Sequence, residues 1–206
     1  MDHATRVLRA LGDFLARYGI YLGIWILIIV SNVMRFRGWR RTSRVLLESP
    51  LTSEWSSSHI AFSGEVQGLW QGRPATLRSI KRGRSGRDVI EATLGTSTSG
   101  RFLIERGGSS VLTRPLHVGA PPRVEPRDPA DGAFSIRSAD RTLTDRLLSD
   151  SKAREAIAGA VAEPGDRVSL ENGRFVARRA YPRSDPPEPA AGVCLTAVRE
   201  MARVLG

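Results

Sequence analysis

The chain has few of the residues that build catalytic and metal centres. It contains one cysteine, Cys194, which excludes an intrachain disulfide and a zinc site built from cysteines. The three histidines, His3, His59 and His117, have no partner at metal-ligand spacing, so we expect surface positions for them. We therefore expect no metal site and no bound cofactor.

Motifs of common enzymes are missing as well. The chain has no Walker A and no G-x-G-x-x-G pattern, and its carboxylates are scattered without an obvious pair. The segment Gly95–Gly100 (GTSTSG) lacks the central glycine spacing of a nucleophile elbow, and we expect it to be a hairpin loop between two antiparallel strands. These absences favour a protein that is not an enzyme.

Acidic and aromatic residues are also in short supply. The chain carries 31 Lys and Arg against 21 Asp and Glu, a formal charge of +10, and nearly all of the cations are arginine. Aromatic residues make up only 6 %, which leaves few platforms for stacking bases, and no recognition motif accompanies the charge. Nucleic acid is therefore not an expected partner, whereas anionic lipid headgroups or an acidic protein surface are.

What the chain does have is one long apolar run. Tyr18–Met34 (YGIYLGIWILIIVSNVM) contains no charge and is followed by a cluster of arginines. As a helix it spans roughly 25 Å, and flanking apolar residues extend it toward a hydrocarbon core of about 30 Å. A cleaved signal peptide would end in small residues, and a buried soluble helix would show a polar face. We therefore predict a transmembrane helix over residues 18–36.

The flanks of this helix predict its orientation. Five arginines lie within ten residues after the apolar run, whereas three lie before it. Because cytoplasmic flanks carry the excess of Lys and Arg, we expect the following domain to be cytoplasmic, at the inner membrane of a bacterium.

Two sets of residues are candidate contact sites. Gly19 and Gly23 lie four positions apart in the span, where small residues allow a second helix to approach, although glycine is also common in spans without such a role. Two arginine-rich clusters are candidates for headgroups or an acidic partner: Arg35, Arg37, Arg40 and Arg41 after the span, and Lys81, Arg82, Arg84 and Arg87 in a Gly-rich turn. The second cluster is more typical of a solvated hairpin tip, because charge at turns is common.

The sequence divides into four parts. Residues 1–17 have apolar residues at helical spacing and predict an amphipathic segment at the membrane interface or an extension of the span. The predicted span, 18–36, is followed by a basic and serine-rich linker over 37–59. The remainder, 60–206, is expected to be one soluble domain.

The soluble part has the pattern of an α+β domain. Short runs of strand-forming residues are separated by Gly-rich turns and indicate an antiparallel meander. The runs are 60–67, 69–70, 75–80, 88–94 and 101–105. A proline-rich loop follows at 114–132, then a strand at 133–137 and helices from 138 to 148, 151 to 162 and 190 to 205. Asn172-Gly173 predicts a two-residue hairpin in which Leu170 pairs with Phe175. The expected fold is antiparallel β strands with helices packed on them.

Part of this region resembles bacterial single-span membrane-anchored domains of unknown function. The resemblance covers a strand followed by two helices and is carried by Phe134, Ile136, Arg137, Ser138, Asp140, Leu147, Leu148 and Ile157. It implies an α+β module and no catalytic residues. By layout, the chain is also similar to the H-type subunit of photosynthetic reaction centres, with one N-terminal span and a β-rich cytoplasmic domain.

Together these features favour a non-enzymatic accessory or scaffold subunit of a larger membrane complex, such as a bioenergetic or photosynthetic one. Its expected partners are anionic lipids and other integral membrane subunits. The alternative is a membrane-tethered enzyme or ligand sensor, which a deep polar pocket with convergent ionisable groups would favour.

Overall fold

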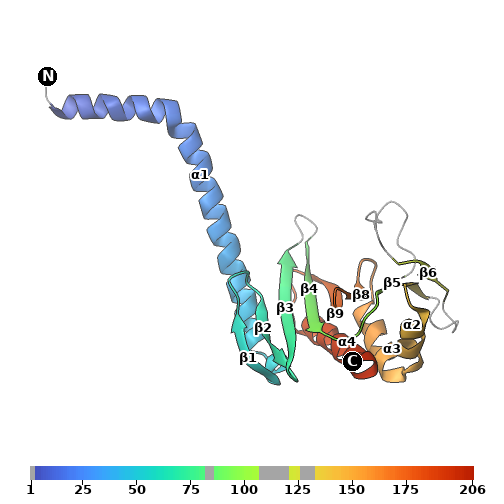
Figure 1. The fold of residues 1–206 in the computed structure, drawn as a ribbon. Coiled ribbons are helices and arrows are strands. Elements are labelled where there is room, and N and C mark those ends of the chain that lie inside the picture. The colour runs from blue at the N-terminus through green and yellow to red at the C-terminus, as the bar shows by residue number, and fades with distance from the viewer. Residues whose placement is uncertain (1–2, 82–85, 107–120, 126–132) are drawn as a thin grey trace. The chain divides into compact units, whose positions relative to one another are not determined.

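The structure is a computed structural model that describes residues 3–81, 86–106, 121–125 and 133–206 (Figure 1). Within these ranges the side chains of residues 3–16 and 35 are not described. The chain forms two compact units, Met1–Arg41 and Thr42–Gly206, which we treat separately.

The first unit, Met1–Arg41, contains most of a single long helix. Helix α1 (His3–Glu48) runs without interruption through the apolar run. Its stretch Arg17–Glu48 is long and apolar enough to cross a membrane. From Ile20 to Met34 every side chain is exposed in the protein alone, as expected for a helix whose apolar surface faces lipid. The prediction of one N-terminal apolar helix is confirmed.

The second unit begins within α1, and this differs from the linker that we expected over residues 37–59. The helix continues to Glu48 and is followed by a 3₁₀ turn, η1 (Pro50–Thr52), and the strand β1 (Trp55–Ile60). Leu46 is 1 % exposed and belongs to the hydrophobic core, while the Thr52 hydroxyl donates to the Leu47 carbonyl at 2.9 Å. The serines and Pro50 therefore end a packed helix rather than form a flexible tether.

A nine-stranded antiparallel sheet forms the centre of this unit (Figure 1). Its remaining strands are β2 (Val66–Trp70), β3 (Arg73–Lys81), β4 (Arg87–Gly95), β5 (Phe102–Arg106), β6 (Arg123–Val124), β7 (Phe134–Ser138), β8 (Arg167–Glu171) and β9 (Arg174–Pro182). The order across the sheet is β1-β2-β3-β4-β9-β8-β5-β7-β6. The first four strands form the predicted meander, but the C-terminal pair β8–β9 is inserted between β4 and β5.

This insertion corrects our interpretation of Gly95–Gly100. Strand β4 pairs with β3 and β9, and β5 pairs with β7 and β8, so the segment joins strands that are not neighbours and is not a hairpin loop. The Thr96 amide donates to the Gly173 carbonyl at 2.9 Å, which ties this connection to the β8–β9 turn. Sequence spacing alone does not distinguish a hairpin from such a crossing.

The run 60–67, expected to be one strand, contains a turn. The Ala61 amide donates to the Glu65 carbonyl at 2.8 Å, and the Gly64 amide donates to the Ala61 carbonyl at 3.0 Å. Gly64 has φ 76°, a left-handed conformation that glycine adopts without steric cost. Strands β1 and β2 are therefore the two arms of a hairpin whose loop is Phe62-Ser63-Gly64.

The predicted Asn172-Gly173 hairpin is confirmed. Both residues have positive φ, 52° and 68°, as a type I′ turn requires, and Leu170 pairs with Phe175. Leu170 and Phe175 are both 0 % exposed.

Three helices complete the unit: α2 (Arg141–Ser149), α3 (Ser151–Ala160) and α4 (Glu188–Leu205). Asp140 caps α2, because its carboxylate accepts the Thr142 amide proton at 2.9 Å. The predicted helix start at 138 is wrong, because Ser138 ends β7. Helix α4 packs on β4 and β9 and buries Cys194, Val198 and Met201 in the core. The fold is α+β, as predicted. Most of the predicted proline-rich loop, 114–120 and 126–132, lies outside the described residues.

Candidate functional site

The two faces of the sheet differ in chemistry. Strand β4 is buried along most of its length, and its side chains alternate between the two faces of the sheet. Ile90, Ala92 and Leu94 point into the core beneath the helices. Glu91 and Thr93 belong to the opposite face, which we call the polar face. Its other members include Thr76 and Arg78 of β3 and Arg174 and Arg178 of β9, which lie beside β4 in register.

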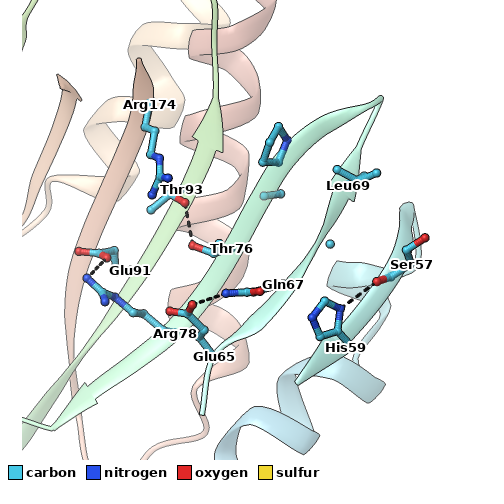
Figure 2. A pocket seen from close by; sticks show the side chains of 13 residues that line it. Ser57, His59, Glu65, Gln67, Leu69, Thr76, Arg78, Glu91, Thr93 and Arg174 are labelled. Carbon is cyan, nitrogen blue, oxygen red and sulfur yellow. Dashed lines mark hydrogen bonds and ion pairs between the residues drawn. The ribbon is translucent and has the colours of Figure 1, made fainter. Parts of the chain in front are cut away.

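An ion-pair network forms the centre of the polar face. Glu91 is 2 % exposed, and its carboxylate binds the Arg78 guanidinium at 2.5 Å (Figure 2). The Arg178 guanidinium pairs with the second carboxylate oxygen from the neighbouring strand. Two cations therefore neutralise one buried carboxylate, which leaves a net charge of +1 on the three groups. A desolvated carboxylate requires such partners.

A pocket of about 610 Å³ lies beside this network (Figure 2). Its lining is mostly polar and comes from five strands and the β1–β2 turn: Ser57, His59, Glu65, Gln67, Gly68, Leu69, Pro74, Ala75, Thr76, Arg78, Glu91, Thr93 and Arg174. The lining groups are largely bonded to one another. The Thr76 and Thr93 hydroxyls lie 2.7 Å apart, and the Gln67 amide donates to the Glu65 carboxylate at 2.5 Å.

Two donors in the pocket lack such partners. The Nε of Arg78 is buried and has no hydrogen-bond acceptor among the described residues. Arg174 is exposed and forms no ion pair with the part of the chain that the structure describes. Of the two, only the exposed guanidinium of Arg174 is open to an acceptor that enters the pocket, because the Arg78 Nε is buried.

The pocket does not hold a recognisable catalytic arrangement. His59 Nδ1 lies 3.1 Å from the Ser57 carbonyl oxygen, and its ring is paired with backbone rather than with a hydroxyl nucleophile. Among the described residues no group of three His, Cys, Asp or Glu side chains is placed to hold a metal ion. What the pocket presents is a set of hydrogen-bonding side chains from neighbouring strands.

Another buried ionisable group lies outside the pocket. Asp166 is 0 % exposed and accepts the amide protons of Ala180 at 2.8 Å and Glu163 at 3.0 Å. Burial raises the pKa of this carboxyl, and the two backbone hydrogen bonds oppose that rise. Asp166 therefore links β9 to the segment that precedes β8.

The glycines of the predicted helix-packing site lie in the first unit. A Cβ atom built at Gly19 or at Gly23 would meet no atom of the described chain within 4 Å. The glycine face of α1 is therefore uncovered by the described residues.

The predicted basic clusters are described only in part. After the apolar run, Arg37, Arg40 and Arg41 are exposed, and Arg40 stacks over the Phe36 ring with its Cζ 5.1 Å from the centroid. The Arg35 side chain lies outside the described residues, as do Arg82 and Arg84. Of the second cluster, Lys81 is exposed at the end of β3. Arg87 forms an ion pair with Glu163.

The polar face was not predicted from the sequence. Its signal was present in β3 and β4, where Arg78 and Glu91 interrupt otherwise apolar or hydroxyl-bearing strands. Only the register, which places these two residues opposite each other, reveals that they form one network.

Comparisons with known proteins do not assign the chain to a family. No protein-family model matches it, and no curated protein matches it. Among solved structures, it is similar to the crystal structure of the mycobacterial trehalose monomycolate transport factor A, TtfA. The two share 14 % sequence identity and a TM-score of 0.49 over 82 % of this chain and 97 % of that chain. A similarity at this level identifies neither a family nor an activity.

Proposed function

We propose that this chain is a single-pass membrane protein that serves as a non-enzymatic accessory or scaffold subunit of a larger membrane complex. Residues 18–36 would cross the inner membrane of a bacterium, and the α+β domain would lie on the cytoplasmic side. Its partners would be anionic lipids and other integral membrane subunits.

One observation carries this proposal: the surface of α1. From Ile20 to Met34 the helix exposes apolar side chains on all sides, a surface that is stable in lipid and not in water. The uncovered glycines, Gly19 and Gly23, offer a place where a second transmembrane helix approaches closely. The arginine excess after the span supports the cytoplasmic orientation.

Purification from native membranes tests the proposal in two stages. After an alkaline carbonate wash we expect the tagged chain to remain in the membrane pellet, because an integral span resists extraction. In mild detergent we expect it to elute with other membrane proteins as a complex larger than its own 22.5 kDa. Extraction by carbonate would overturn the membrane span, and elution as a lone chain would overturn the subunit role.

The polar pocket supports a second candidate function, a membrane-tethered ligand-binding domain. The exposed guanidinium of Arg174 would bind an acceptor group of a small molecule. Native mass spectrometry of the purified chain tests this function. A bound small molecule that is present with the parent and absent with Arg174→Ala would support it. Arg123→Ala, an exposed arginine outside the pocket lining, is the matched control.

A further inference from the structure

The β1–β2 hairpin carries an apolar side chain at its apex. Phe62 is 88 % exposed, more than any large apolar residue of the α1 span, where the highest value is 77 % at Ile20. It is the first residue of the three-residue loop that Gly64 closes in a left-handed conformation. The Phe62 ring is not part of the hydrophobic core. Moving so exposed an apolar ring out of water is favourable in free energy.

The hairpin loop is hydrogen-bonded to the C-terminal part of α1. The Ser43 hydroxyl donates to the Gly64 carbonyl, and Ser43 itself is 2 % exposed. In the sequence, Ser43 follows Met34, the last residue of the apolar run, by nine positions. Nine residues bridge at most about 30 Å even when fully extended. The chain between Met34 and the serine that holds the tip is therefore no longer than this limit.

The surroundings of this tether suit an anionic lipid surface. Arg44 follows Ser43 directly and is exposed, and Arg41 two positions earlier is exposed as well. Basic residues beside a span attract anionic headgroups, and a neighbouring apolar side chain adds the burial that charge alone lacks.

We propose that Phe62 inserts into the headgroup region of the same membrane, so that the β1–β2 hairpin is a second membrane contact of the soluble domain. The proposal rests on the membrane span proposed above and adds a contact that the span does not provide. A domain held at both α1 and the hairpin tip would have a fixed orientation toward the bilayer instead of rotating about a single tether.

Site-specific fluorescence tests this contact in the full chain. The natural thiol of Cys194 is fully buried, so a single introduced cysteine is labelled selectively. Phe62→Cys carries an NBD fluorophore at the tip, and Leu69→Cys, at an exposed position near the other end of β2, is the matched control. Both variants are reconstituted into vesicles of phosphatidylcholine and phosphatidylglycerol, with or without nitroxide-labelled lipid.

We expect the nitroxide lipid to quench NBD at position 62 at least threefold more than NBD at position 69, and the emission at 62 to shift to the blue. Flotation of the same vesicles reports the span separately. Equal quenching at both positions in a chain that floats with the vesicles would overturn the hairpin contact and leave the span intact. Failure to float would overturn both. Phe62→Ser should fold normally, because so exposed a ring contributes little to the core. A second label at Ser57→Cys reports the orientation of the domain toward the bilayer. We expect Phe62→Ser to change the quenching by nitroxide lipid at that site.

Discussion

Glu91 and Arg178 face each other across the β4–β9 ladder, and the buried carboxylate of one binds the guanidinium of the other. Arg78 completes the pair from the opposite side on β3. The network couples the consecutive strands β3 and β4 to β9, which lies far from them in the sequence.

Replacing this carboxylate should destabilise the domain. In Glu91→Gln an amide of the same shape keeps one acceptor but leaves two cations without a counter-charge. We expect the free energy of unfolding to fall by about 1–3 kcal/mol. Urea unfolding of the detergent-solubilised chain, followed by circular dichroism, measures it. The double variant Glu91→Gln/Arg178→Gln should lose less than the sum of the two single variants, because the pair acts as a unit. Strict additivity would contradict the coupling.

The turn at Asn172-Gly173 offers a test of backbone conformation. Gly173→Val places a β-branched residue at φ 68°, and we expect a loss of roughly 1–3 kcal/mol in the same unfolding measurement. Gly173→Asn is the control, because asparagine tolerates this conformation, and it should lie much closer to the parent. Equal midpoints for valine and asparagine would show that the turn is not strained by side chains.

Helices α2 and α3 should weaken in acid. Hydrogen bonds from the Thr142 side chain and amide lower the pKa of Asp140, and the Ala153 amide lowers the pKa of Asp150. A carboxylate with a lowered folded pKa contributes stability above the unfolded value of about 3.9, and this stability is lost as pH falls through the folded value. Asp140→Asn keeps the cap without the charge, so its thermal midpoint should vary less between pH 5 and pH 2 than that of the parent. A parallel decline in both proteins would refute the contribution of this group.

The side of the membrane is testable with a single cysteine. Ser56 is exposed on β1, and burial raises the pKa of the native Cys194 thiol, so Cys194 contributes little background. In intact cells, we expect an impermeant maleimide to leave Ser56→Cys unlabelled until the membrane is permeabilised. Labelling before permeabilisation would place the domain outside the cytoplasm.

Lateral packing of the span is tested at its glycines. Gly19→Ile/Gly23→Ile keeps the helix apolar enough to insert but fills the uncovered face. We expect this variant to reach the membrane and to recover at least fivefold less of the co-purifying complex. Gly19→Ala/Gly23→Ala, which adds only a methyl group at each position, should retain more. Full recovery with isoleucine would mean that this face contacts lipid.

Local signals in the sequence predicted much of the fold. The charge-free run at 18–34, the Asn172-Gly173 turn and the apolar stripe of α4 each depend on neighbours within a few positions, and each was found. The errors arose where distant residues decide. The stretch 42–59 is polar in composition, yet Leu46 and Trp55 are buried by partners elsewhere in the domain. The polar face was missed for the same reason, since Arg78, Glu91 and Arg178 meet only through strand register.

The central position of β8 and β9 in the sheet has a consequence for how this protein folds during its synthesis. Strand β4 is complete at Gly95, but the partner that covers its free edge ends only at Pro182. At about 5–20 residues per second, a ribosome needs roughly 4–17 s to make the chain between them. Throughout that interval this edge of β4 lacks the partner that covers it in the folded domain. Such edges template aggregation, so this domain would depend on a chaperone or on rapid completion of synthesis to reach its native sheet.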